Sequence, residues 1–186
     1  MNLFDKFPLG LTYADFLARY ATEQQKQRWR QVHEQVILTP AQRGLLAGFP
    51  RAVNVLCLAG AWCGDCINQC PIFEHFVAAA PVLRVRYFDR DEHADLQREL
   101  QINGGNRVPV VVFFSEDGYE VARYGERTLS KYRQMMRDQV GPSCPTGIQA
   151  AGDRLLAEVT QDWLNEFERV QWLLRLSPRL RQMHGD

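Results

Sequence analysis

The stretch VNVLCLAGAWCGDC, residues 53–66, joins a short apolar run to two cysteines that are close together in sequence. Residues 53–58 are apolar and partly β-branched, a pattern typical of a strand that is buried on both faces. A helix is expected to follow from about Cys63 to Ala79. The cysteines of Cys63-Gly64-Asp65-Cys66 are therefore predicted to lie where a buried strand gives way to a helix.

A Cys-X-X-Cys pair at the start of a helix has a definite chemical meaning. Residues three apart on a helix face the same way, so the two thiols can close a small disulfide ring. Cys63 is expected at the N-cap, where free N–H groups and the helix dipole favour a thiolate. Because the thiolate is the attacking species in disulfide exchange, Cys63 is the predicted nucleophile. Cys66, one turn further in, is expected to be more buried and to resolve the mixed disulfide.

Three other interpretations of these cysteines remain open. In the first interpretation the pair forms half of a zinc site, but the sequence has no second pair and its four histidines lie elsewhere. In the second interpretation a metal cluster is bound by three thiolates, those of Cys63, Cys66 and Cys70, although their spacing matches no common ligand set. Alternatively, the cysteines are small core residues, which Trp62 and Gly64 disfavour because both suit an exposed tip. No metal and no bound cofactor are expected.

The elements that follow the cysteines predict a mixed sheet. Strands are expected over residues 82–88, 110–114 and 119–124, with a short helix over 94–100 and another over 129–140. Ser115-Glu116-Asp117-Gly118 is typical of a tight hairpin between the last two strands. The order β-α-β-α-β-β-α, with further helices at both ends, predicts an α/β fold whose sheet is covered on both faces.

Helical segments are expected on both sides of this core, which spans residues 51–141. In the N-terminal extension, residues 1–50, Thr12 and Asp15 are expected to start one long amphipathic helix that continues to Val36. Thr39-Pro40 is expected to open a short second helix. Residues 141–147 are rich in Gly and Pro and predict a linker, after which one long C-terminal helix is expected over residues 148–182. Cys144 in the linker is a candidate for an exposed thiol.

The composition excludes several classes of protein. The chain has 186 residues, with 22 Lys and Arg and 22 Asp and Glu, so its formal net charge is zero. This balance gives no electrostatic footprint for nucleic acid or an anionic membrane. Residues 1–6 lack the pattern of a signal peptide, and no apolar run has the length of a membrane span. A reducing, cytoplasmic setting is expected, and a chain of this length does not need its five cysteines as a disulfide framework.

Residues 53–140 resemble the thioredoxin family. Besides the cysteine pair, the resemblance rests on Pro71, on Val108-Pro109, and on Gly118 and Gly125. It implies the thioredoxin fold, with terminal helices added here, and a cis proline at Pro109 that lies against the disulfide. With Pro109 cis, the backbone of Val108 is expected to pair with an extended substrate chain. Trp62, Gly64 and Asp65 are the other residues expected to shape the active site.

The chain departs from the family at three positions. Cys57 aligns with a buried aspartate that takes the proton of the resolving cysteine, and Tyr87 aligns with the lysine that pairs with it. Cys66 is therefore expected to lose its proton to water or to a more distant carboxylate. Asp65 replaces the usual proline. Its charge either disfavours the Cys63 thiolate, which leaves the pKa of Cys63 near that of a free thiol, or Asp65 caps the helix and points to water.

The sequence thus predicts a thiol-disulfide oxidoreductase that reduces protein or small-molecule disulfides through Cys63 and Cys66. A reductase or a low-molecular-weight thiol is expected to supply the electrons. The main alternative is a thioredoxin-fold binding module with a vestigial redox pair. A metal or iron–sulfur site that bridges two chains through Cys63 is a further alternative. The apolar faces of the added helices are expected to pack on the core or to form the seam of a homodimer.

Overall fold

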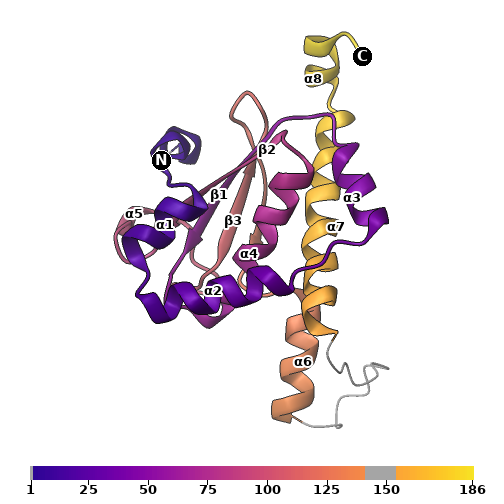
Figure 1. Ribbon diagram of the computed structural model, residues 1–186. Helices are drawn as coiled ribbons and strands as arrows, with labels where there is room; N and C mark the ends of the chain where they lie inside the picture. Colours follow the sequence, from indigo (N-terminus) through magenta and orange to yellow (C-terminus); the bar gives the residue numbers. More distant parts are fainter. Residues whose placement is uncertain (1, 141–153) are drawn as a thin grey trace.

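The computed structural model describes residues 2–140 and 154–186 and is built around a four-stranded sheet (Figure 1). The strand order is β2-β1-β3-β4, with β1 parallel to β2 and antiparallel to β3, and β3 antiparallel to β4. The strands are β1 (Val53–Ala59), β2 (Leu83–Asp89), β3 (Val110–Phe114) and β4 (Glu120–Gly125). The predicted mixed sheet and α/β class are confirmed.

Helices surround this sheet and extend beyond it at both ends of the chain. They are η1 (Leu3–Leu9), α1 (Tyr13–Tyr20), α2 (Glu23–Gln35), α3 (Pro40–Ala47), α4 (Gly64–Ala79), α5 (Ala94–Glu99), α6 (Leu129–Val140), α7 (Leu155–Arg175) and α8 (Pro178–His184). In Figure 1, α4 crosses the front of the sheet, and α7 runs beside α4. The helices expected at the two termini are therefore present, while the linker predicted over 141–147 lies outside the described residues.

The alternation of side chains along β3 shows which helices cover which face. Phe113 packs against Phe167 of α7, with ring centroids 5.0 Å apart. The next residue, Phe114, packs against Phe4 of η1 at 5.5 Å. Because successive strand residues point to opposite faces, α7 and η1 lie on opposite sides of the sheet. The β-branched and aromatic residues of β1 and β3 are buried, as a strand covered on both faces requires.

The long helix predicted from Thr12 to Val36 is wrong, because the chain makes two helices there. Ala21 is extended and ends α1. Thr22 then caps α2: its hydroxyl accepts from the Gln25 N–H at 3.3 Å, and the Gln25 side chain accepts from the Thr22 N–H at 2.8 Å. This reciprocal capping box satisfies backbone groups that a continuous helix would use differently, so a new helix starts at Glu23.

The single C-terminal helix predicted over residues 148–182 is also wrong. Helix α7 ends at Arg175, and α8 begins at Pro178. Proline has no backbone N–H and suits the first turn of a helix, so it starts a new helix instead of continuing α7. The prediction also missed η1, a 3-10 helix that buries Leu3 and Phe7.

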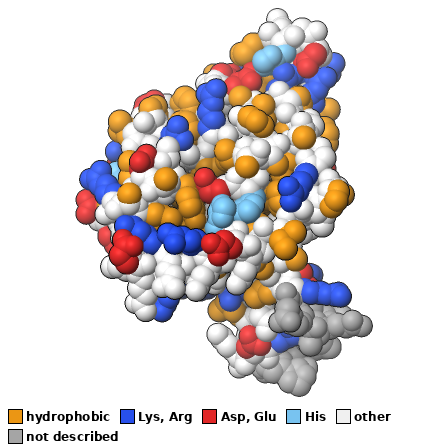
Figure 2. Space-filling view, in the orientation of Figure 1, with side chains coloured by type: hydrophobic (Ala, Val, Ile, Leu, Met, Phe, Trp, Pro, Cys, Tyr) orange, Lys and Arg blue, Asp and Glu red, His pale blue; other side chains and the backbone are white. Residues whose placement is uncertain are grey.

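Charged side chains of both signs are interspersed over the face shown in Figure 2. This distribution agrees with the equal numbers of acidic and basic residues in the sequence. No helix among residues 2–140 and 154–186 has both the length and the apolar character needed to cross a membrane.

Candidate active site

Cys63 and Cys66 lie at the start of α4, directly after the loop that follows β1. Cys63 is the N-cap residue and is partly exposed, whereas Cys66 is fully buried. The backbone N–H of Gly60, in the loop after β1, donates to Cys66 Sγ at 3.4 Å. The pair thus combines an accessible sulfur at a helix N-terminus with a second sulfur that solvent does not reach.

The sulfur atoms of Cys63 and Cys66 interact, and this interaction moves their pKa values apart. The interaction with Cys66, followed by burial, raises the pKa of Cys63 above that of an ordinary thiol. Burial alone would raise the pKa of Cys66 as well. However, interactions with the neighbouring Cys63 and Cys70 thiols and the hydrogen bond from the Gly60 N–H stabilise its thiolate and lower its pKa. The pair therefore loses its first proton readily and retains the second.

Val108 and Pro109 face the pair from the loop before β3. The Val108–Pro109 peptide bond is cis. The Cys63 thiol donates to the Val108 carbonyl oxygen at 3.6 Å. Gly125, at the end of β4, packs so closely behind Pro109 that a Cβ at this position would collide with the Pro109 carbonyl. The structure thus brings Val108 and Pro109, which are distant in sequence, against Cys63.

Trp62 and Gly64 flank Cys63 on the surface. The Trp62 side chain is 47% exposed, yet two contacts hold it in place. Its Nε1–H donates to Asp91 Oδ2 at 3.2 Å, and the Arg90 guanidinium lies 4.5 Å from the ring centroid. A Cβ at Gly64 would meet no atom within 4 Å. This side of the pair is therefore an open surface with a positioned aromatic ring.

Asp65 forms a half-buried ion pair that neither sequence interpretation included. Its Oδ2 lies 2.7 Å from an Arg127 guanidinium nitrogen, and the two side chains are 17% and 19% exposed. Arg127 also binds Glu126 Oε1 at 2.9 Å. The expectation that Asp65 points to water is wrong. The prediction placed the pKa of Cys63 near that of a free thiol, whereas its interaction with Cys66 and its burial raise this pKa above that of a free thiol.

Gln69 connects α4 to the loop after β4 and to the C-terminal extension. Its Nε2–H donates to the carbonyl oxygens of Asp65 at 3.2 Å and Glu126 at 2.9 Å. Its Oε1 accepts from the Trp163 indole at 2.9 Å. All these contacts are made one turn beyond Cys66, so α7 helps to fix the helix that carries the pair.

Trp29 connects the N-terminal extension to the other side of the site. Its side chain is fully buried, and its Nε1–H donates to the Ala61 carbonyl oxygen at 2.9 Å. Ala61 immediately precedes Trp62 and Cys63. Helix α2 thus holds the loop that leads to Cys63.

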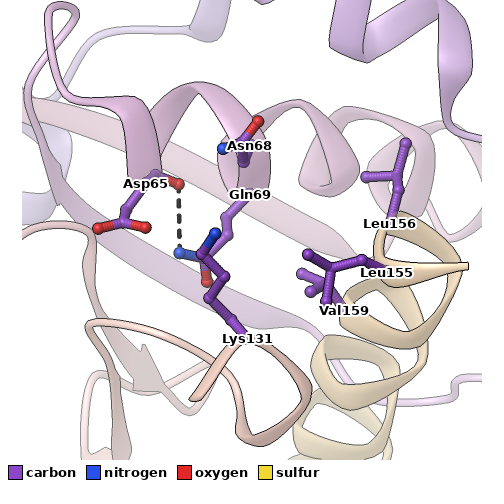
Figure 3. A pocket seen from close by; sticks show the side chains of 7 residues that line it. All are labelled: Asp65, Asn68, Gln69, Lys131, Leu155, Leu156 and Val159. Atoms are coloured by element: carbon purple, nitrogen blue, oxygen red, sulfur yellow. Dashed lines mark hydrogen bonds between the residues drawn. The ribbon is translucent and has the colours of Figure 1, made fainter. Parts of the chain in front are cut away.

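A cavity of about 230 Å³ lies beside the first turns of α4 (Figure 3). Asp65, Asn68 and Gln69 of α4 and Lys131 of α6 form its polar part. The start of α7 contributes the apolar part, which consists of Leu155, Leu156 and Val159. The C-terminal extension therefore adds an apolar wall next to Asp65.

The position beneath the pair holds thiols and a phenol instead of a carboxylate and an amine. Cys57 and Tyr87 are in register on β1 and β2, and both are buried. The Tyr87 hydroxyl donates to the Cys70 carbonyl at 3.3 Å and lies 3.2 Å from Glu74 Oε1. Burial raises the pKa of Glu74. A carboxylate is thus present at the far side of Tyr87, outside the reach of Cys66.

Residues 2–140 and 154–186 contain no group of three or more His, Cys, Asp or Glu side chains arranged to hold a metal ion. The proposed zinc half-site and the cluster of Cys63, Cys66 and Cys70 therefore find no further ligands among the described residues. The predicted exposed thiol, Cys144, lies outside them.

Sequence reasoning found the residues that carry a short-range signal and missed their distant partners. Arg127, Gln69, Trp29 and Trp163 all contact the site. Trp29 belongs to the apolar pattern of α2, and Trp163 to that of α7, but the pattern gives no sign of their hydrogen bonds. Arg127 has no spacing relation to Asp65 that a single sequence reveals.

The comparisons with known proteins agree with this architecture. A sequence model of the thioredoxin family matches residues 10–139. No curated protein sequence matches the chain. Among solved structures, a protein of unknown function from Pseudomonas aeruginosa is 16% identical, with a TM-score of 0.68 over 88% of this chain and 93% of that one. An HIV epitope-scaffold protein is 16% identical, with a TM-score of 0.62 over 100% of this chain and 99% of that one.

Thioredoxin O2 from Arabidopsis thaliana is 19% identical, with a TM-score of 0.35 over 52% of this chain and 84% of that one. At these identities, the solved structures with the higher TM-scores support the fold alone. The family model covers well over half of the chain and supports a redox-type function in general terms. The fold predicted from the sequence is confirmed, and the chain belongs to the thioredoxin family.

Proposed function

We propose that this protein is a thiol-disulfide oxidoreductase that reduces disulfides through a dithiol cycle of Cys63 and Cys66. The observation that carries the proposal is the cysteine pair at the N-terminus of α4, with one residue partly exposed and the other buried. An accessible sulfur next to a buried one is the arrangement that separates attack from resolution.

The cycle begins when the Cys63 thiol turns from the Val108 carbonyl oxygen and gives its proton to the neighbouring Cys66 thiolate. Cys63 Sγ then attacks one sulfur of the substrate disulfide, that S–S bond breaks, and the leaving thiolate takes up a proton. Cys66, after losing its proton again, attacks Cys63 in the mixed disulfide. This step closes the Cys63–Cys66 disulfide and releases the second substrate thiol, so that two electrons have passed to the substrate.

The substrate is an extended chain or a small disulfide that lies along Trp62, Val108 and Pro109. The open surface around Gly64 and the fixed Trp62 ring support this orientation. Backbone pairing with Val108 would align the substrate sulfur with Cys63. A reductase or a small thiol restores the dithiol. The proposed setting is the cytoplasm, where a close cysteine pair is more often catalytic than structural.

An insulin-reduction assay with dithiothreitol as electron donor tests the proposal. The wild-type protein should accelerate reduction, and Cys63→Ser should abolish the acceleration, by at least about a hundredfold, because it removes the nucleophile. Cys144→Ser, which leaves the motif intact, is the matched control and should retain activity. A wild-type protein no faster than Cys63→Ser would refute the proposal and favour a binding module.

The redox equilibrium of the pair tests the direction of electron flow. A potential near about −270 mV, the value of thioredoxin, supports a reductant, whereas one near about −120 mV supports an oxidant. The measurement is thiol trapping and mass spectrometry over a series of thiol buffers. A pair that forms no disulfide at any potential contradicts both directions.

A further inference from the structure

Four of the cysteines form a row that runs from the surface into the core. Cys63 is the N-cap residue of α4, Cys66 lies in the first turn of the helix, and Cys70 lies one turn further along it. The Cys70 and Cys57 sulfur atoms are 3.8 Å apart. Cys66, Cys70 and Cys57 are all fully buried. The row therefore has one end at the surface, at Cys63, and one end beneath α4, at Cys57.

The secondary structure brings Cys70 and Cys57 together. Cys66 and Cys70 are one turn apart on α4 and project from the same side of the helix. Cys57 belongs to β1, where its register partners are Tyr87 and Val111. Tyr87 reaches the Cys70 carbonyl, which shows that this face of the sheet is the one that packs on α4.

The 3.8 Å between the Cys57 and Cys70 sulfur atoms is a non-bonded contact between two free thiols. A disulfide bond is about 2.05 Å long, so a shift of less than about 2 Å along the line of the sulfur atoms would form one. Buried cysteines that serve only as small apolar residues have no need to contact one another. Here they contact each other, and Cys70 lies one turn beyond Cys66 on the same side of α4.

We propose that Cys57 and Cys70 form a second, internal dithiol-disulfide couple that exchanges electrons with the Cys63–Cys66 pair. This proposal rests on the proposed function, because Cys66 is the point at which the two couples meet. The internal couple gives the reduced protein two further electrons beyond those of the surface pair.

The exchange is balanced without any external reagent. In the protein with a Cys63–Cys66 disulfide, Cys70 Sγ attacks Cys66 Sγ, so that a Cys66–Cys70 bond forms and Cys63 leaves. Cys57 Sγ then attacks Cys70 Sγ, so that a Cys57–Cys70 bond forms and Cys66 leaves. The protons of Cys57 and Cys70 end on Cys63 and Cys66. The surface pair is reduced, the internal pair is oxidised, and the surface pair is ready for a second substrate disulfide.

The burial of Cys57 and Cys70 determines how the internal couple is oxidised. Solvent reaches neither Cys57 nor Cys70, so a dissolved oxidant or a protein disulfide cannot attack them directly. Burial also raises the pKa of Cys70, which keeps it protonated until it exchanges with its neighbour. The proposal therefore requires that oxidation of the internal couple passes through Cys66.

A disulfide map of the wild-type protein tests the proposal. The reduced protein is exposed to excess oxidised glutathione under native conditions, its remaining thiols are blocked in denaturant, and the disulfides are located by mass spectrometry. Trypsin cannot separate the four cysteines, because the chain has no Lys or Arg between Arg51 and Arg84. Cleavage after Trp62, before Asp65 and before Ile67 separates them.

The expected map contains a Cys57–Cys70 crosslink as well as the Cys63–Cys66 disulfide. A map in which Cys63–Cys66 is closed while Cys57 and Cys70 are both blocked as thiols overturns this inference and leaves the proposed function intact. A map without Cys63–Cys66 overturns the proposed function, and the inference with it. The wild-type map needs no substitution, so a variant that fails to fold cannot obscure the result.

Two variants test whether the exchange passes through Cys66 and how many substrate disulfides each reduced molecule can reduce. Cys66→Ala should slow formation of the Cys57–Cys70 crosslink by at least about tenfold, whereas Cys144→Ala, the matched control, should leave it unchanged. Without an added reductant, the reduced wild-type protein should reduce about twice as much substrate disulfide per molecule as Cys70→Ala. Equal amounts, or an unchanged crosslinking rate in Cys66→Ala, would overturn the exchange through Cys66.

Discussion

At the scale of single residues, the site depends on how charge is distributed over two sulfur atoms. The Gly60 N–H donates to Cys66 Sγ, and this hydrogen bond and the neighbouring Cys63 and Cys70 thiols lower the pKa of Cys66. These interactions concentrate negative charge on the buried sulfur, while the accessible sulfur keeps the proton. In the proposed cycle, Cys63 becomes the nucleophile when this proton moves inward to Cys66.

The titration of the reduced pair follows from this arrangement. The pKa of Cys66 is lowered from 9.0, so the thiolate absorbance of the reduced protein should rise in a step below pH 9.0. Cys66→Ala should remove that step, and Cys144→Ser should retain it. Because the folded-state pKa is the lower one, ionisation of Cys66 adds stability as pH rises from that pKa toward 9.0, and the gain is lost as pH falls through it. A protein without any step below pH 9.0 would contradict this assignment.

Arg127 is expected to tune the pair through Asp65. In Arg127→Ala the Asp65 carboxylate loses its partner, and its unshielded charge disfavours a thiolate on Cys66. The thiolate step should move to higher pH, by up to about one unit, and the free energy of unfolding should fall by about 1–2 kcal/mol. Ultraviolet titration and urea denaturation measure both effects.

Arg123→Ala is the matched control for this prediction, because it removes an arginine whose ion pairs with Glu99 and Glu120 lie away from the cysteines. It should leave the thiolate step in place. A thiolate step that stays in place in Arg127→Ala as well would show that Asp65 does not influence the pair.

These residues also show how far a single sequence leads. Cys63 and Cys66 were found because a short spacing has a direct chemical meaning, and Pro109 was found through the resemblance to the thioredoxin family. Arg127 was missed because its partner Asp65 lies far away along the chain, and any of several arginines would have the same charge. The contact of Cys57 with Cys70 depends on how β1 and α4 pack, which the order of elements alone does not determine.

At the scale of helices and strands, the two terminal extensions hold opposite sides of the same loop and helix. Trp29 of α2 binds the Ala61 carbonyl before the pair, and Trp163 of α7 binds Gln69 after it. The sequence predicted both extensions from their apolar periodicity but not where they break. The reason is that periodicity continues across Ala21, while the capping box of Thr22 and Gln25 acts locally.

Trp29→Phe tests the contribution of α2 to the site. The substitution keeps an aromatic ring but removes the hydrogen bond to Ala61, which leaves a buried carbonyl without its donor. The free energy of unfolding should fall by about 1–3 kcal/mol, and the rate of insulin reduction should fall because the loop before Cys63 loses its support.

Trp172→Phe on α7 is the matched control, since that indole is 47% exposed and bonds only to a surface glutamate, Glu168, among the contacts of the described residues. It should change the free energy of unfolding by less than about 0.5 kcal/mol. If Trp29→Phe has no larger effect than Trp172→Phe, α2 does not position the loop.

At the scale of the whole molecule, the terminal helices and the sheet share one core. Phe167 of α7 contacts Phe73, Phe76 and Phe113, which belong to α4 and β3. Gln171 of α7 also bonds the backbone of Arg51, just before β1. The mixed sheet covered on both faces was predicted from the succession of elements. The position of α7 was not, because an apolar stripe on a helix fits any exposed apolar surface.

This shared core predicts that α7 and the sheet unfold together. Phe167→Ala leaves a cavity between α4, α7 and β3 and should lower the free energy of unfolding by about 3–5 kcal/mol. Far-ultraviolet circular dichroism and tryptophan fluorescence should report a single, coincident transition in urea, before and after the substitution. Leu173→Ala on the same helix is the control, because Leu173 is 46% exposed and its removal opens no cavity. If Phe167→Ala instead separates the two signals into two transitions, α7 forms a unit of its own, and its hold on Gln69 would then not stabilise the helix that carries Cys63 and Cys66.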